Sequence, residues 1–214
     1  MDGQPNIFAV YKPKGPTSHD LMYTLKRKYP GQKVGHAGTL DPLAHGVLVV
    51  GVGRSATKLL HTEEFSTKEY LATIKLGETS TTDDEEGQKR AIEVAKPPTE
   101  QEVDRVLQAF VGTIEQVPPQ YSAVKLAGVP AYKKARRGQA TELAARTVTV
   151  SQIALLSYQW PYLKILIETG PGVYVRSLAR DLGEKLGTGG YIADLERTRV
   201  GRFGLEDTVP INGD

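Results

Sequence analysis

The stretch Lys68-Glu-Tyr-Leu-Ala-Thr-Ile-Lys-Leu-Gly77 places an apolar side chain at every second position from Tyr70 to Leu76. This period of two predicts a β-strand with one well-buried face. Further along the chain, Thr99-Glu-Gln-Glu102 has the pattern of a capping box, and the apolar residues behind it repeat at helical spacing up to Val111. The middle of the chain therefore combines a half-buried strand with a capped helix.

The segments on either side also mix strands and helices, without a strict strand-helix-strand rhythm. We therefore expect an α+β fold with a mixed, mostly antiparallel sheet flanked by helices and loops. No change of composition marks a linker, so we expect a single domain over residues 1–214, with a basic excursion at about residues 118–146. The expected strands cover residues 6–11, 47–52, 68–77, 147–156, 162–169 and 199–205, and the expected helices cover residues 17–29, 99–111, 130–137 and 175–186.

The composition excludes several classes of protein. The chain has 214 residues, of which 39% are hydrophobic and 24% charged, as in ordinary globular proteins. It has no Cys, which excludes disulfides, thiolate catalysis and Cys-ligated zinc, and its four His are too widely spaced to predict a metal site. No apolar run approaches the roughly 18–20 residues of a membrane span, so we expect a cytoplasmic protein.

Charge is distributed unevenly along the chain. The formal net charge is only +2, but residues 1–60 carry 8 basic and 3 acidic side chains, residues 61–110 carry 6 and 12, and residues 111–214 carry 13 and 10. Two basic regions thus flank an acidic one. Such runs are more often solvated surface than a binding site, so the pattern only favours a polyanionic ligand.

The segment Gly35-His-Ala-Gly-Thr-Leu-Asp-Pro-Leu-Ala-His-Gly46 is a candidate functional loop. Its glycines let the backbone approach a ligand closely, and Pro42 biases Asp41 away from helical geometry. Asp41 could therefore be presented on a stiff turn as a nucleophile. Asp-Pro is also a common turn starter, and Thr39 or Asp41 could simply cap a helix, so the segment alone leaves both interpretations open.

Several motifs follow one another along about residues 6–205. The main ones are Lys12-Pro-Lys-Gly-Pro-Thr-Ser18, His36-Ala-Gly-Thr-Leu-Asp-Pro42, Lys68-Glu-Tyr70, Pro118-Pro-Gln-Tyr-Ser-Ala-Val-Lys125, Gly172-Val-Tyr-Val-Arg-Ser-Leu178 and Leu195-Glu-Arg-Thr-Arg-Val-Gly201. Any one of them is weak evidence, but the ordered set is specific, and together they resemble the TruB family of tRNA pseudouridine synthases.

The resemblance implies isomerisation of uridine to pseudouridine in the T loop of tRNA, at position 55, after the base is flipped out of the RNA stack. The reaction transfers no electron or phosphate, so no cofactor and no metal are expected. The implied partner is the T-arm stem-loop, bound by a monomer. Two alternatives stay open: a tRNA-binding folding chaperone, and the catalytic subunit of a guide-RNA-dependent enzyme.

The resemblance also implies roles for individual residues. Asp41 falls on the catalytic nucleophile, which attacks either the base or the sugar C1′, and Arg176 falls on the cation that keeps it ionised. Tyr70 falls on the active-site tyrosine, whose ring suits stacking on uracil and whose phenol could help the C5 proton leave. The residues implied to bind the base or the RNA are His36, Tyr174, Leu195, Lys12, Lys133, Lys134, Arg136 and Arg137.

Two further expectations concern the acidic region and the end of the chain. Asp83-Asp-Glu-Glu86 is interpreted as a solvated loop rather than a magnesium site. Typical bacterial relatives continue into a small C-terminal RNA-binding domain. Because this chain ends at Asp214, we expect that domain to be absent.

Overall fold

The computed structural model describes residues 6–122, 124–126, 128–135, 137–138 and 143–211. The chain divides into two compact units, one made of residues 1–71 and 195–214 and the other of residues 72–194. Strands β4 (Lys68–Leu76) and β12 (Gly190–Val200) each begin in one unit and end in the other. The expectation of a single domain stays a prediction.

The first unit contains strands β1 (Asn6–Lys12), β2 (Val34–His36), β3 (His45–Val52), β13 (Phe203–Gly204) and β14 (Thr208–Val209), helices α1 (Ser18–Lys28) and α2 (Arg54–Leu59), and the 3-10 turns η1 (Glu63–Phe65) and η2 (Leu205–Asp207). Its strands lie in the order β14-β1-β3-β12, with β2 added to β3. The β1–β3 pair is antiparallel, whereas β14 is parallel to β1 and β12 is parallel to β3.

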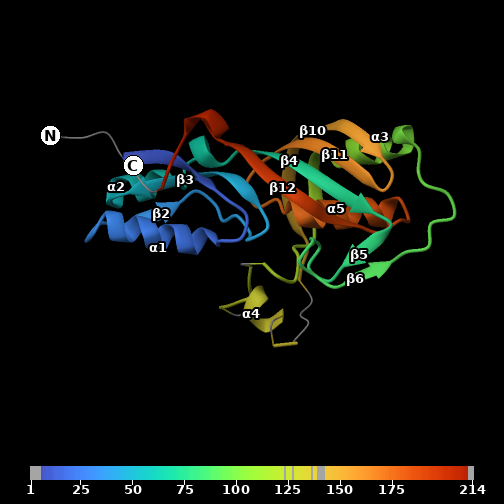
Figure 1. Cartoon of the computed structure of the whole chain (residues 1–214), viewed down its shortest axis with the longest axis horizontal. Helices are drawn as coiled ribbons and strands as arrows, with labels where there is room; N and C mark the ends of the chain where they lie inside the picture. The colour runs from blue at the N-terminus through green and yellow to red at the C-terminus, as the bar shows by residue number, and fades with distance from the viewer. Residues whose placement is uncertain (1–5, 123, 127, 136, 139–142, 212–214) are drawn as a thin grey trace. The chain divides into compact units, whose positions relative to one another are not determined.

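Helix α1 lies against this sheet (Figure 1). Its apolar residues Leu21, Met22 and Leu25 pack against buried valines and Leu48 from the strands. The helix begins where expected, because the Thr17 side chain accepts a hydrogen bond from the Asp20 backbone N–H and the Asp20 carboxylate accepts one from the Thr17 N–H at 2.8 Å. This cap also fixes where the preceding loop enters the helix.

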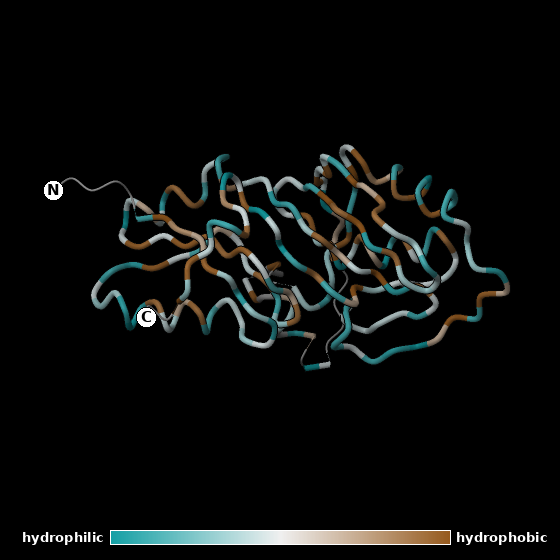
Figure 2. Tube along the Cα trace, turned by 45° about the horizontal axis from the view of Figure 1, so that its top comes forward, coloured by the Kyte–Doolittle hydropathy of each residue, from teal (hydrophilic) through white to brown (hydrophobic). Residues whose placement is uncertain are grey.

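The second unit contains strands β5 (Glu78–Ser80), β6 (Lys89–Ala91), β7 (Gly112–Gln116), β8 (Lys125–Leu126), β9 (Val129–Pro130), β10 (Arg146–Gln159) and β11 (Tyr162–Thr169), and helices α3 (Glu100–Gln108), α4 (Ala131–Ala135) and α5 (Val175–Lys185). Its main strands lie in the order β4-β11-β10-β7, and β10 is antiparallel to both of its neighbours. Helix α3 packs on β10 and α5. The apolar residues of both units concentrate along their strands (Figure 2).

The α+β fold with a mixed, mostly antiparallel sheet is confirmed, and so is the Thr99 capping box of α3. The single strand expected at residues 199–205 is instead a hairpin: β12 ends at Val200, a turn follows at Gly201, and β13 covers Phe203–Gly204. Charged residues interrupt the apolar pattern of β12, which hid the strand. Helix α2, strand β7 and the β5–β6 hairpin were not predicted.

None of the helices within the described ranges is long and apolar enough to cross a membrane.

Gly46 allows β3 and β12 to come together in the first unit. It pairs with Arg197, has φ +104°, and a Cβ at this position would collide with the Arg197 carbonyl oxygen. The contact is with backbone rather than with a flexible side chain. Any side chain at this position would therefore separate the two strands beside the Asp41 loop, which is residues 37–44 between β2 and β3.

We expect Gly46→Ala to lower the free energy of unfolding by about 3 kcal/mol, because left-handed backbone strain and a backbone collision add together. Urea denaturation measures the change. Gly112→Ala is the matched control, since Gly112 also has φ +104° but open space around its Cβ position. The control should lose only about 1–2 kcal/mol, and equal losses in the two variants would contradict the collision.

Lys68 places a partly buried ammonium at the start of β4, where it donates to the Phe65 and Ser66 carbonyls at 3.2 and 2.9 Å. Burial, and next the charge of Arg197, lower the pKa of Lys68 to about 8. An unfolded lysine has a pKa near ~10.4, so the unfolded chain binds more protons than the folded chain between these two values. Deprotonation of Lys68 therefore favours the folded state.

We expect Lys68 to make the free energy of unfolding increase as the pH rises from about 8 to about 10. The test compares urea midpoints at pH 7.5 and 9.5 for the wild type and for Lys68→Met, which removes the titrating group. The wild type should gain more stability, or lose less, over this interval than the variant does. The same pH dependence in both proteins would show that Lys68 titrates normally.

Candidate active site

The loop that carries Asp41 is held to the first unit by hydrogen bonds on both sides of the aspartate. Before it, the buried Ser18 hydroxyl donates to the Leu40 carbonyl at 2.9 Å, and the Leu40 N–H donates back to the hydroxyl oxygen at 2.8 Å. After it, the Pro42 carbonyl accepts from the Gly15 N–H at 2.9 Å. Asp41 itself is half-buried. Its carboxylate is thus presented on a backbone with little freedom.

Lys12 is expected to bind RNA, but it does not lie on the surface, where a lysine that binds phosphate would lie. Its side chain is 0% exposed, and its ammonium donates to the carbonyls of Pro13, Pro42 and Ala44, the last at 2.6 Å. A buried ammonium needs such partners to offset its lost hydration. The expected RNA contact is therefore corrected: Lys12 holds the Asp41 loop from inside.

Tyr70 lies on β4 with only 7% of its surface exposed, next to a side chain that the sequence patterns did not single out. Arg197 of β12 is fully buried, and the Tyr70 phenol is close enough to hydrogen-bond to its guanidinium. Burial lowers the pKa of Arg197, while Tyr70 and the charge of Asp41 oppose that shift. The structure therefore gathers Asp41, Tyr70 and Arg197 within the first unit.

A sequence signal for Arg197 exists in hindsight. Leu195 and Arg197 are both buried and two residues apart, as the alternation of a strand requires. Because the expected strand began only at residue 199, Arg197 was not assigned to a buried face. Leu195, expected in the base pocket, is 7% exposed on the same strand.

His36 is the last residue of β2 and is half-buried. Burial, and next the charge of Arg197, lower its pKa, so its imidazole is neutral at neutral pH. Its Nδ1 has no hydrogen-bond partner among the residues that the structure describes. A neutral ring suits contact with a base more than contact with a phosphate.

Arg176 lies on α5 in the second unit, 5% exposed. Its guanidinium lies 3.6 Å from the Asp84 carboxylate and donates to the carbonyls of Thr82 and Tyr121 at 3.0 and 2.9 Å. One helical turn further along, Arg180 pairs with Asp83 at 2.9 Å. Two arginines of one helix thus hold the turn that contains Asp83 and Asp84, here called the acidic turn.

The expectation of a solvated acidic loop is therefore wrong for half of it. Asp84 is buried and Asp83 is paired, whereas Glu85 and Glu86 are exposed. The charges of the two adjacent aspartates are balanced by the two arginines, which lie one helical turn apart on α5, so no metal is needed to balance them. In the described part of the chain, no group of three or more His, Asp or Glu side chains is arranged to hold a metal ion.

Tyr174 caps α5 and is fixed by one side chain of β7. The Gln116 amide oxygen accepts from the Tyr174 N–H at 2.8 Å, and the Gln116 amide nitrogen donates to the Tyr174 carbonyl at 3.1 Å. The half-buried Tyr174 packs against Val124, Ala131 and Leu143, which form a small apolar cluster in the basic segment. This residue therefore connects α5 to that segment within the second unit.

The basic segment, at about residues 118–146, contains the four cations expected to bind RNA, and the structure describes only some of them. Lys133 and Lys134 belong to α4; Lys134 is half-buried, and Arg137 is exposed just after the helix. Arg136 lies outside the described residues. The short helix itself, expected over residues 130–137, is confirmed at Ala131–Ala135.

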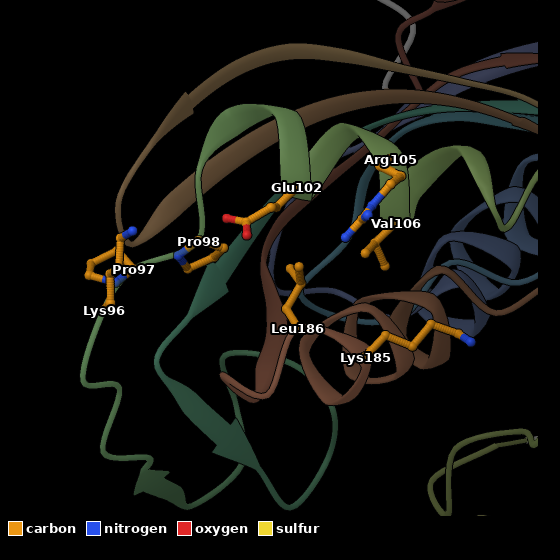
Figure 3. Close-up of a pocket in the computed structure, with 8 residues that line it drawn as sticks. All are labelled: Lys96, Pro97, Pro98, Glu102, Arg105, Val106, Lys185 and Leu186. Carbon is orange, nitrogen blue, oxygen red and sulfur yellow. The ribbon is translucent and has the colours of Figure 1, made fainter.

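The second unit also contains a pocket (Figure 3). It is bordered by α3 and the end of α5, with Lys96, Arg105 and Lys185 among its lining side chains. Its carboxylate, Glu102, is engaged in the α3 cap with Thr99. None of the predicted catalytic residues lines this pocket.

Comparison with known proteins identifies the family. The model of the TruB family pseudouridylate synthase N-terminal domain matches residues 26–175, and that of the tRNA pseudouridylate synthase B C-terminal domain matches residues 176–212. The protein named tRNA pseudouridine synthase B of Mycobacterium sp. (strain KMS) is 45% identical over 96% of this chain and 70% of its own length. The protein of that name from Parabacteroides distasonis is 45% identical over 94% of this chain and 87% of its own length.

Solved structures agree with these relatives. A chain of a Cbf5–Nop10–Gar1 complex superposes with a TM-score of 0.70 at 30% identity over 92% of this chain. A chain of an H/ACA RNP bound to a substrate RNA superposes with a TM-score of 0.69 at 27% identity over 96% of this chain. This chain spans about half the length of each of these two solved chains, 49% and 50%. With its family match, its relatives and its fold in agreement, the chain belongs to the TruB family of pseudouridylate synthases.

Proposed function

We propose that this protein isomerises uridine to pseudouridine in the T loop of tRNA, at position 55, with Asp41 as the nucleophile. Uridine isomerisation in tRNA is supported by relatives named tRNA pseudouridine synthase B that match almost the whole chain. The observation that carries the assignment of the nucleophile is the Asp41 loop, braced by Ser18 and Lys12 and grouped with Tyr70. We further propose that the protein acts as a monomer in the cytoplasm.

The reaction balances within the nucleotide. The bond from ribose C1′ to uracil N1 breaks, a bond from C1′ to C5 forms, C5 loses its proton and N1 gains one. Asp41 assists by adding covalently to the base or to C1′, and leaves again at the end. Nothing is oxidised or reduced, so the groups required are a nucleophile, a surface that holds the detached uracil, and an acceptor for the C5 proton.

The described residues offer groups for each requirement. Tyr70 presents a mostly buried ring beside Asp41, suited to stacking on uracil, and a phenol that could accept or relay the C5 proton. His36 offers a neutral imidazole to the RNA base. We propose Arg176 as the cation that keeps Asp41 ionised in the RNA complex, and Tyr174 and Leu195 as walls of the uracil pocket.

Lys133, Lys134, Arg136 and Arg137 are proposed to bind phosphates of the T arm. Lysine and arginine contacts to the backbone supply most of the affinity in such complexes, while loop shape and the flipped base supply selection. The exposure of Arg137 supports this role.

A second candidate function is supported by the solved relatives. The complexes described as Cbf5–Nop10–Gar1 and H/ACA RNP contain further proteins or RNA, so a partner-dependent subunit is the alternative. The higher identity to tRNA pseudouridine synthase B favours the stand-alone enzyme. Activity of the purified chain on a bare T-arm stem-loop, without guide RNA or partner proteins, separates the two.

We expect the wild type to release tritium from a T-arm stem-loop containing [5-³H]uridine, and Asp41→Asn to release it at least about 10³-fold more slowly, because the amide keeps the shape but is not a nucleophile. Binding of the RNA should be retained. Asp104→Asn, which changes an exposed carboxylate on α3, is the control and should be fully active.

Two results would overturn this prediction in different ways. A wild-type protein that releases no tritium refutes the proposed reaction. An Asp41→Asn variant that releases tritium at the wild-type rate refutes the nucleophile. If RNA binding persists while all chemistry is absent in the wild type, the tRNA-binding chaperone becomes the better assignment.

We expect Lys134→Glu combined with Arg137→Glu to weaken T-arm binding and to reduce the slope of log K against log salt by about 0.7–0.9 for each phosphate that is no longer neutralised. Filter binding from 50 to 300 mM salt measures both. Lys96→Glu combined with Arg105→Glu makes the same charge change at the pocket of Figure 3 and serves as the control. An equal loss of affinity in both double variants would mean that only net charge matters.

A further inference from the structure

Arg197 connects three separate segments of the first unit. It extends from β12, where its side chain is 0% exposed. Its Nε donates to the Val47 carbonyl of β3 at 2.8 Å, and its Nη2 donates to the Gly38 carbonyl in the Asp41 loop at 3.1 Å. A guanidinium is planar, with donors in a fixed fork, so it sets the distance between the groups that it binds.

The third segment is β4, which supplies Tyr70. The Tyr70 phenol is within hydrogen-bonding reach of the guanidinium, and the charge of Asp41 is near enough to favour its protonated form. The same rigid group therefore contacts the tyrosine and the loop that bears the aspartate.

The Asp41 loop lies directly on this cation. A Cβ placed on Gly38 would lie 3.6 Å from Arg197 Nη1 and 3.1 Å from Lys68 Cε. The space beside the Gly38 α-carbon is thus already occupied by both side chains. Any displacement of the guanidinium would be transmitted to the loop.

The burial of Arg197 is costly if stability is its only purpose. Burying a charge costs several kcal/mol, and well-packed apolar residues often replace buried charges without loss. The carbonyls of Val47 and Gly38 instead hold this charge in a set position, which indicates a role beyond stability.

We propose that Arg197 is a positioning residue that holds the Asp41 loop and the Tyr70 phenol in fixed register. It touches neither the uridine nor the RNA, because its side chain is fully buried. This inference rests on the proposed function, in which Asp41 and Tyr70 act on the same uridine.

The test is Arg197→Lys, which keeps the charge but can no longer bridge Val47, Gly38 and Tyr70 together. At saturating T-arm RNA we expect the single-turnover rate to fall by about 10²-fold, as a small misplacement of reacting groups does. The Kd for the RNA should change by no more than about twofold, because uniform binding is unaffected. Arg199→Lys is the matched control: Arg199 lies on the same strand and pairs with Glu69 at 3.1 Å, and its variant should keep the wild-type rate.

A double-mutant cycle locates the effect. If Arg197 acts through Tyr70, Arg197→Lys should slow Tyr70→Phe by much less than it slows the wild type. Full additivity of the two losses would overturn a role through the tyrosine. A wild-type rate in a folded Arg197→Lys protein would overturn positioning altogether, as would a loss confined to RNA binding.

A measurement with Arg197 intact covers the case in which the lysine variant does not fold. The Arg197 Nε–H signal in ¹⁵N NMR should exchange slowly and should shift in Tyr70→Phe and in Asp41→Asn, but not in Arg199→Lys. Unshifted signals would refute the inference. An inactive wild type would refute the proposed function instead, since the NMR experiment does not depend on catalysis.

Discussion

Buried cations that donate to backbone carbonyls are the constraint on which the Asp41 loop depends. Lys12 from β1 holds the carbonyls of Pro42 and Ala44, and Arg197 from β12 holds that of Gly38. Both strands are paired to β3, so the shape of the loop follows from the register of the sheet. A buried ammonium or guanidinium is stable only while these carbonyls stay in place, which couples the loop to the strands.

The second unit uses the same physical principle with carboxylates in place of some carbonyls. Arg176 and Arg180 lie one turn apart on α5 and face Asp84 and Asp83 in the acidic turn. Arg176 also donates to the Tyr121 carbonyl, at the start of the basic segment. The acidic region of the sequence is therefore partly an internal counter-charge, and its remaining carboxylates are exposed to solvent.

Isomerisation of a nucleotide consumes no second substrate, so a pseudouridine synthase depends on the placement of a few groups rather than on a cofactor. In such an enzyme the residues that hold the reacting groups matter as much as the groups themselves. Lys12 and Arg197 occupy motifs that the sequence marks as characteristic, yet both side chains are fully buried. Their place in those motifs is explained by the backbone that they hold.

Periodicity, capping and ordered motifs are local properties, so the α+β class, strands β1, β3, β4, β10 and β11, the start of α1, the Thr99 capping box and the family could all be predicted from the sequence. It did not reveal β12, since Glu196 and Arg199 break the apolar pattern that marks a strand. The inward direction of Lys12, the burial of Asp84 and the contact between Arg197 and Tyr70 follow from tertiary packing. Each of these depends on which distant carbonyl, carboxylate or phenol lies opposite a charge, and that is set by strand register and packing rather than by neighbours in the chain.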